Sequence, residues 1–258
     1  MTDLRTRAQT LLDLHSAPEI LTVVNVWDAI TARVVSEVDG IKAIATASHS
    51  IAASHGYEDG ENIPVDEMIE AVGLIVRSTD LPVTADLEAG YGDPGETVRK
   101  AIGVGVVGAN LEDQKKPLAE AVGAVEAVVK AGEAEGVPFV LNARTDVVAQ
   151  AGDRPHDEVI ADAIERGKAF LDVGAPVVFV PGPLSEDDVR AFVDAWGPQK
   201  LTTIGYPGSI PLERQQELGV ARVSYGPFSQ SVALMALQDL TNDVVSGGGL
   251  PSDFRVLN

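Results

Sequence analysis

The sequence predicts an α/β protein built as a (β/α)8 TIM-type barrel in a single domain. Three observations carry this prediction. The chain has 258 residues, 45% of them hydrophobic, which suits one large domain with a substantial core. From residue 20 onward, short apolar and β-branched runs alternate with stretches of helical spacing. Eight such pairs occur, and strands buried on both faces with a helix after each are typical of a closed parallel barrel.

The individual elements follow from this alternation. The expected strands, each bounded by turn residues, are at 20–27, 41–47, 83–87, 106–111, 139–143, 177–180, 201–204 and 222–225. The expected helices are at 29–38, 65–78, 94–102, 118–135, 157–172, 186–196, 211–218 and 229–245. Asp93 and Pro94, with Glu96, form a clear helix start. The domain spans residues 1–258, and 246–258, which contain three consecutive glycines, are expected to form a C-terminal arm.

The alternative fold is a doubly wound open sheet. That fold commonly binds a dinucleotide through a G-x-G-x-x-G turn after its first strand, and this chain has no such turn there. The barrel is therefore preferred.

Composition excludes several classes of partner. The chain carries 19 Lys and Arg against 39 Asp and Glu, a formal charge of −20, which disfavours binding to nucleic acid. It contains no cysteine, which removes disulfides, thiolate metal sites and thiol nucleophiles. No apolar run reaches the ~18 residues of a membrane span, and the first residues lack the apolar core of a signal peptide. We expect a soluble cytoplasmic protein with no membrane partner.

The stretch PVTADLEAGYGDPG, residues 82–95, is the first candidate for chemistry. Alternation along a strand places Asp86 and Glu88 on one face, at the carboxyl end where barrel enzymes carry their active sites. Two neighbouring carboxylates are costly to bury without a cation, and Mg²⁺ prefers such oxygen ligands. The alternative is that Asp86 caps the turn and Glu88 points to solvent.

Neighbouring strand ends strengthen the first interpretation. Glu112 and Arg144 end the fourth and fifth expected strands, so they should meet Asp86 and Glu88 over the barrel mouth. Such a set suits a Mg²⁺ ion held by few protein ligands and several waters, with an arginine fork for a carboxylate or enolate. For Arg144, the alternative is an ordinary ion pair with Asp146.

Several sequence segments together resemble the isocitrate lyase/phosphoenolpyruvate mutase superfamily, and most closely its short, mutase-like branch. The segments are NVWDAITAR (25–33), TASHSIAASHGYEDG (46–60), PVTADLEAGYGDP (82–94), GANLEDQ (108–114), FVLNARTDVV (139–148) and GVARVSYGP (219–227). They occur in the order of that superfamily, over about residues 20–240.

The resemblance implies a barrel that acts on small 2-oxo or 2-hydroxy acids through an enolpyruvate-like intermediate. It implies Mg²⁺ as the cofactor, with Mn²⁺ as a possible substitute. It also implies a homodimer or homotetramer in which paired subunits exchange the last helix.

The resemblance assigns roles to individual residues. Asp86 would be the direct metal ligand, and Asp59, Glu88 and Glu112 would hold metal-bound waters. Arg144 would bind the far end of the substrate or a migrating group. The substrate-binding candidates are Trp27, Asp28, Ala47, Ser48, His49, Asp86 and Arg144, with the backbone amides of residues 47–49 receiving the substrate carboxylate. Trp27 is equally compatible with a place in the core.

Departures from the superfamily bear on the reaction. Its isocitrate and methylisocitrate lyases carry a lid with the sequence K-K-C-G-H, whose cysteine acts as a general acid. Its mutases carry a lid in the same place that contains an asparagine. Here Glu112 is followed by Asp-Gln-Lys-Lys-Pro and a helix, with neither residue in this segment. A short lid admits water or a proton, which favours cleavage over intramolecular transfer.

The sequence thus predicts a Mg²⁺-dependent lyase or decarboxylase that cleaves a C–C bond of an oxaloacetate-like 2-oxo acid or a 2-hydroxy acid. The catalytic candidates are Arg144, Glu112, Lys116 and His49, the last two as proton donors alongside water. A phosphoenolpyruvate or phosphonopyruvate mutase, or a phosphonopyruvate hydrolase, is the alternative. Three further hypotheses have less support: a Schiff-base aldolase, a barrel enzyme that acts on a phosphosugar, and a binding protein without catalytic activity.

Overall fold

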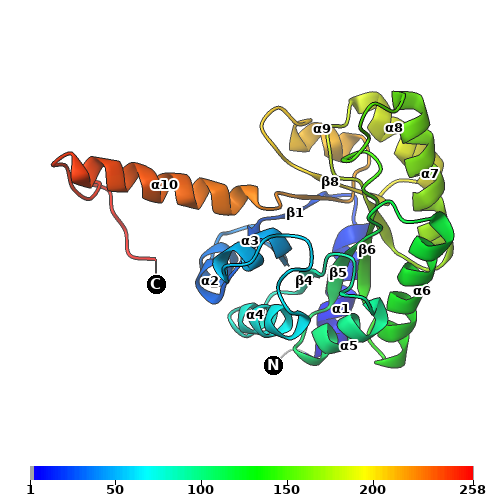
Figure 1. Ribbon diagram of the computed structural model, residues 1–258, viewed down its shortest axis with the longest axis horizontal. Helices are drawn as coiled ribbons and strands as arrows, with labels where there is room; N and C mark the ends of the chain where they lie inside the picture. The colour runs from blue at the N-terminus through cyan, green and yellow to red at the C-terminus, as the bar shows by residue number, and fades with distance from the viewer. Residues whose placement is uncertain (1–2, 258) are drawn as a thin grey trace.

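The computed structural model describes residues 3–257, and its strands form the predicted parallel α/β barrel (Figure 1). Within these residues one nine-stranded sheet has the order β1-β9-β8-β7-β6-β5-β4-β3-β2, with every neighbouring pair parallel. The strands are β1 (Leu21–Val23), β2 (Asn25–Val26), β3 (Ile44–Thr46), β4 (Val83–Asp86), β5 (Gly108–Glu112), β6 (Val140–Arg144), β7 (Val177–Phe179), β8 (Leu201–Ile204) and β9 (Arg222–Ser224).

The ninth strand arises because the first predicted strand, at 20–27, is divided at Val24. Its first half, β1, pairs with β9, and its second half, β2, pairs with β3. Residues 21–26 therefore pair with β9 through β1 and with β3 through β2, and this closes the sheet into a barrel. The barrel has the eight strand positions that the alternation of the sequence predicts.

Ten helices are described within residues 3–257. They are α1 (Leu4–Ser16), α2 (Ala29–Ser36), α3 (Ser48–Ser54), α4 (Val65–Arg77), α5 (Pro94–Gly103), α6 (Leu118–Ala134), α7 (His156–Asp172), α8 (Glu186–Trp196), α9 (Leu212–Glu217) and α10 (Phe228–Val245). Eight of them lie where the sequence predicts helices, and no end differs by more than two residues. The other two, α1 and α3, were not expected.

Helix α1 closes the amino-terminal end of the barrel. Leu11 packs against Gly108, the first residue of β5, so closely that an added Cβ at Gly108 would lie 2.8 Å from Leu11 Cδ2 and 2.7 Å from the Val140 carbonyl oxygen. His15, at the end of the same helix, is buried, and its Nδ1 lies 2.8 Å from the Leu11 carbonyl oxygen. The polar site must therefore lie at the opposite, carboxyl end of the strands.

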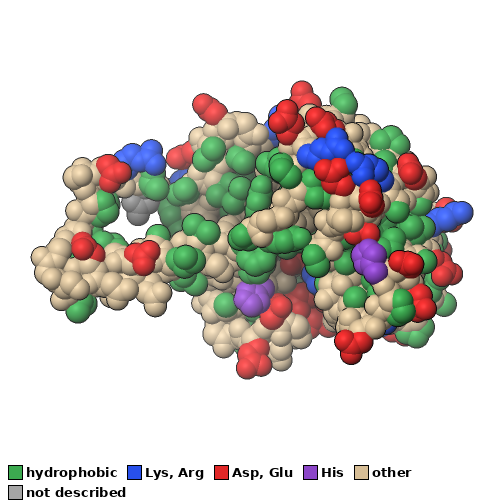
Figure 2. Space-filling model, turned by 90° about the horizontal axis from the view of Figure 1, so that it is seen from above, with side chains coloured by type: hydrophobic (Ala, Val, Ile, Leu, Met, Phe, Trp, Pro, Cys, Tyr) green, Lys and Arg blue, Asp and Glu red, His purple; other side chains and the backbone are tan. Residues whose placement is uncertain are grey.

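Helix α10 leaves the barrel instead of packing on it (Figure 1). Its only buried residue is Gln230, and its apolar side chains are mostly exposed. In Figure 2 the helix forms a lobe at one side of the molecule, and apolar side chains gather on the barrel near its base. The expected arm follows: residues 246–257 contain no helix or strand, and residue 258 lies outside the described residues. None of the described helices has the length and apolar character that a membrane-spanning segment needs.

Candidate active site

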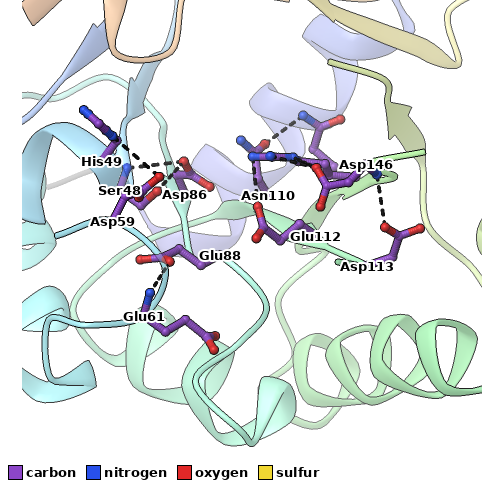
Figure 3. Close-up of polar contacts among 12 residues, drawn as sticks. Ser48, His49, Asp59, Glu61, Asp86, Glu88, Asn110, Glu112, Asp113 and Asp146 are labelled. Carbon is purple, nitrogen blue, oxygen red and sulfur yellow. Dashed lines mark hydrogen bonds and ion pairs between the residues drawn. The ribbon is translucent and has the colours of Figure 1, made fainter. Parts of the chain in front are cut away.

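Three side chains that the sequence predicts to meet are the last residues of adjacent strands. Asp86 ends β4, Glu112 ends β5 and Arg144 ends β6. Glu112 and Arg144 are direct partners in the register of β5 and β6, and Asp86 is the register partner of Asn110. Figure 3 shows Asp86 between Ser48 and Asn110, with Glu88 and Glu112 at the same end of the barrel. Parallel strands thus deliver this set to one edge, as the alternation of side chains requires.

Asp86 is held by the loop after β3. Its Oδ2 accepts hydrogen bonds from the Ser48 hydroxyl at 2.8 Å and the Ser48 amide at 3.2 Å. Its own amide donates to Thr46 Oγ1 at 2.9 Å. One carboxylate oxygen is therefore fixed by α3, and the carboxylate keeps a defined orientation at the barrel mouth.

Glu88 reaches the site through a turn and not through the strand. The strand ends at Asp86, and Glu88 has a left-handed backbone conformation, with φ of 51°. The side chain is buried; Oε1 accepts a hydrogen bond from the Tyr91 hydroxyl at 3.0 Å, and Oε2 accepts one from the Glu61 amide. Burial raises the pKa of Glu88, and the charges of Asp86 and Asp59 act in the same direction.

Glu112, Arg144 and Asp146 form a partly buried ion-pair group. Arg144 Nη1 lies 2.9 Å from Glu112 Oε2, and Arg144 Nη2 lies 2.7 Å from Asp146 Oδ1. Burial raises the pKa of Glu112 to about 8, which outweighs the opposite effect of Arg144, and nearby carboxylates add to the increase. The guanidinium also lies over the Phe179 ring, 5.9 Å from its centroid. The pair between Arg144 and Asp146, expected as the ordinary alternative, is present together with the contact to Glu112.

A hydrogen-bonded row of neutral side chains lies beneath the charged ones. Asn142 Nδ2 donates to Asn110 Oδ1 at 2.8 Å, and Thr202 Oγ1 donates to Asn142 Oδ1 at 2.7 Å. All three side chains are buried. This row satisfies the polar groups inside the barrel and supports the strand ends of β5 and β6 from below.

The remaining candidates lie around this group. His49 Nδ1 is 3.5 Å from Asp59 Oδ2, and both side chains are about half exposed. The Ala47 amide donates to the Val26 carbonyl, so this amide and that of Ser48 already have acceptors in the protein. Lys116 lines a cavity of about 200 Å³ together with Glu112 and Arg144.

Trp27 and Asp28 lie at the end of β2, toward the base of α10. The Asp28 carboxylate caps α2 by accepting from the Thr31 amide and hydroxyl, both at 2.8 Å. Trp27 lines an apolar groove beside α2. Their expected contact with substrate stays a prediction.

The carboxylates fit a metal ion that is bound by few direct protein ligands. Within residues 3–257 no group of three or more Asp, Glu or His side chains is close enough to form a complete metal cage. Mg²⁺ commonly keeps most of its waters and takes one or two carboxylates. Asp86 lies close enough to Glu88 and Glu112 for its charge to add to the increase that burial causes in the pKa of each. This unbalanced negative charge is what a divalent cation would neutralise.

Comparisons with known proteins agree with this geometry. The family model described as phosphoenolpyruvate phosphomutase matches residues 11–245. The chain belongs to the phosphoenolpyruvate phosphomutase family.

The proteins that are similar to this chain carry different names. A proposed phosphonomutase from Burkholderia cenocepacia J2315 has a crystal structure that is 36% identical to this chain, with a TM-score of 0.86 and coverage of 95% of this chain and 100% of that one. Oxaloacetate acetylhydrolase, in complex with its product oxalate, is 26% identical, with a TM-score of 0.85 and coverage of 96% and 91%. The probable 2-methylisocitrate lyase 2 of Corynebacterium glutamicum is 28% identical over 259 residues, 94% of this chain and 82% of that protein.

Sequence reasoning missed the residues that hold the carboxylates in place. Glu61 donates its amide to Glu88 and accepts from the Tyr91 amide at 2.5 Å, and Tyr91 in turn donates its hydroxyl to Glu88. Glu61 lies 27 residues from Glu88, so no local spacing connects them. Thr202 is an inward-facing residue of β8, and alternation along that strand was a usable signal for it.

Proposed function

We propose that this protein is a Mg²⁺-dependent lyase or decarboxylase that cleaves a C–C bond of a small 2-oxo acid of the oxaloacetate type, or of a 2-hydroxy acid. The observation that carries the proposal is the short segment between β5 and α6. Only residues 113–117 separate Glu112 from Leu118. Five residues in a tight turn are too few to fold over the barrel mouth as a protective lid, which an intramolecular transfer of a reactive group needs.

The chemistry follows from the charges at the strand ends. A bound Mg²⁺ ion would act as a Lewis acid toward the 2-oxo and carboxylate oxygens of the substrate. In a 2-oxo acid, the electron pair of the bond between C3 and the departing carbon would move into the 2-oxo group and form an enolate. In a 2-hydroxy acid, the hydroxyl group would lose its proton to a base and become the new 2-oxo group, and the electron pair of the C2–C3 bond would leave with the departing fragment, which then takes up a proton. Arg144 would bind the departing carboxylate or stabilise the enolate, and its permanently charged, planar guanidinium supports this role.

The substrate carboxylate would be received at the start of α3. The amides of Ala47 and Ser48 have acceptors within the protein, so we assign this role to the following amides, beginning with His49. Completion of the reaction needs a proton at C3. Water, His49 and Lys116 are the candidate donors: His49 is half exposed beside Asp59, and Lys116 lines the cavity next to Arg144.

A panel of acids tests the proposal directly. The protein is incubated with Mg²⁺, or with Mn²⁺ as a substitute, and with oxaloacetate, alkylated malates, phosphonopyruvate or phosphoenolpyruvate, and the products are identified by NMR. We expect pyruvate, or the corresponding 2-oxo acid, from a carbon acid and not from the phosphorus compounds. Background decarboxylation of oxaloacetate by free metal is measured with Asp86→Ala. Turnover of the phosphorus compounds alone would refute the proposal.

The second candidate is a phosphoenolpyruvate or phosphonopyruvate mutase, or a phosphonopyruvate hydrolase. The 36% identity to the proposed phosphonomutase favours it. The same Arg144 would then bind a phosphoryl group. The absence of an asparagine in residues 113–117 argues against the mutase, whereas a hydrolase needs no protected lid.

We also propose that the active form is a homodimer or homotetramer whose subunits exchange α10. A helix that follows a barrel strand normally packs on the barrel, but α10 projects away with Val232, Met235 and Leu237 at least 60% exposed. An apolar groove of about 800 Å³ lies beside its base, lined in part by α2. A second copy of α10 would cover this groove and bury its own apolar residues.

Solution mass tests the assembly. Light scattering of the whole chain should give two or four times the mass of one chain, and Met235→Asp should lower it toward one. Asp239→Lys changes the charge of the same helix without touching its apolar residues and serves as the control. A monomeric wild-type protein at micromolar concentration would refute the exchange.

A further inference from the structure

We propose that Arg166 is a positioning residue: it fixes the segment after β5 and the loop after β6, and thereby holds Glu112 and Arg144 in register at the barrel mouth. Arg166 lies on α7, outside the barrel, and is 9% exposed. The inference rests on the proposed function only for its kinetic consequence, because the contacts themselves do not depend on the reaction.

The Arg166 guanidinium contacts the segment 113–117 twice. Its Nη1 donates to Asp113 Oδ2 at 3.0 Å and to the Lys116 carbonyl oxygen at 2.9 Å. Its Nε donates to Asp162 Oδ1 at 2.9 Å, one turn earlier on α7. The Arg166 guanidinium is therefore held by Asp162 on its own helix and binds the segment 113–117 at Asp113 and at Lys116.

Asp113 passes this anchoring to the next strand. Its Oδ1 accepts from the Lys115 amide and from the Asp146 amide, both at 3.0 Å, and its own amide donates to the Arg144 carbonyl oxygen at 3.0 Å. The contact between Asp113 and the Asp146 backbone is drawn in Figure 3. One buried carboxylate thus joins the loops after β5 and β6.

Asp146 completes the connection to the functional arginine. Its Oδ1 lies 2.8 Å from Arg144 Nε, and Arg144 Nη1 contacts Glu112. A continuous path of polar contacts therefore runs from Arg166 through Asp113 and Asp146 to the Glu112–Arg144 pair. Without Arg166, the Asp113 carboxylate, whose side chain is 2% exposed, would lose its cation. The two loops would then have to rearrange so that water can reach this carboxylate.

The segment itself needs such an anchor. Gln114 and Lys115 both have left-handed backbone conformations, with φ of 49° and 54°, although neither is glycine. Such conformations persist where surrounding contacts enforce them. Arg166 bonds to the residues on either side of this pair, and it also fixes the backbone of Lys116, whose side chain lines the cavity beside Arg144.

Hydrogen exchange and kinetics on variants test the inference. In Arg166→Met we expect the amides of Lys115, Lys116 and Asp146 to exchange at least about tenfold faster, while those of residues 20–26, across the barrel, are unchanged. On the acid that the wild type turns over, kcat/KM should fall at least about tenfold. Arg166→Lys, which keeps the charge but not the fork, should recover part of both effects.

Arg154→Met is the matched control. Arg154 bonds to the other oxygen of Asp162 at 2.9 Å, is 41% exposed and lies before α7, outside the path to Arg144. Both readouts should stay at wild-type values. If Arg166→Met does not fold, Arg166→Lys carries the comparison.

The outcomes separate the inference from the proposed function. Faster exchange across the whole barrel with unchanged kcat/KM would mean that Arg166 only stabilises the fold, and wild-type exchange at residues 113–117 would overturn the inference outright. Absence of turnover by the wild type would refute the proposed function, and the exchange measurement would still decide the role of Arg166.

Discussion

Metal binding should release a proton from Glu112. Burial, reinforced by the neighbouring carboxylates, raises the pKa of this side chain to about 8 in the metal-free protein. A proton and a cation compete for the same negative charge, so metal affinity falls as the pH falls below 8. At pH 7 binding should release at least about half a proton from this group, and the apparent affinity at pH 6 should be at least about tenfold weaker than at pH 8. Glu88, whose pKa is also raised, adds to the release.

Calorimetric titration with Mn²⁺ in two buffers of different ionisation enthalpy counts these protons without any substrate. Glu112→Gln removes the group, so its proton should disappear from the count and the pH dependence should become shallower. Glu133→Gln, which changes an exposed glutamate near the far end of α6, is the matched control and should behave like the wild type. Release of less than about 0.3 proton at pH 7, with an affinity that does not change between pH 6 and 8, would refute the reasoning.

Three further predictions concern the metal ligand and the closed end of the barrel. Asp86→Ala should lower metal-dependent turnover at least about a thousandfold with an unchanged near-ultraviolet circular dichroism spectrum; retained activity would contradict its assignment as the direct ligand. Burial, helped by the charge of Arg222, lowers the pKa of His15 from 6.5 to about 3, so the unfolded chain takes up a proton that the folded protein does not. The stability present above pH 6.5 should therefore be lost as the pH falls toward 3, by about 2 kcal/mol at pH 5, and urea unfolding should show this loss in the wild type but not in His15→Gln. Gly108→Ala should destabilise the folded protein by about 1–3 kcal/mol in thermal unfolding, because the added Cβ meets Leu11. The control Gly123→Ala adds a Cβ in open space on α6 and should stabilise the protein. Equal melting temperatures of the two variants would contradict this packing.

The barrel was predictable because buried parallel strands have a strong sequence signature. Apolar runs alternate with helical stretches throughout residues 20–245, and all eight strand positions were found. The helices α1 and α3 were missed for separate reasons. Helix α1 buries only Ala8, Leu11 and His15, so its apolar stripe is narrow, and it has no side-chain cap. Helix α3 has the sequence SHSIAAS, which resembles a polar loop after a strand.

The site was predictable where it depends on strand register and not where it depends on loops. Asp86, Glu112 and Arg144 end adjacent strands, so alternation alone brings them together. The contacts of Glu61 and Tyr91 with Glu88 arise from turns with left-handed residues, which have no periodic signal. Metal coordination and substrate contacts of these residues stay predictions.

Arg166 was a residue that the sequence could have revealed. It occupies the buried face of α7 together with Val159, Ala163 and Phe170, at the spacing of an apolar stripe. A charged residue in such a stripe needs a buried partner, and a search for that partner leads to an aspartate at a strand end. The signal was present but was obscured by the many surface charges of this acidic chain.

The division between strands and loops also explains how one family can carry several reactions. Glu112 and Arg144 are register partners, so neither can move without disturbing the pairing of β5 with β6. Residues 113–117 lie outside the sheet and can change in length and composition while that register is kept. Under the proposed function, the strand ends would stabilise the enolate, and changes in the segment after β5 could alter its fate without disturbing them. In this chain the segment is short and tied to α7 through Arg166, so its geometry is set by the outer helices as well as by its own residues.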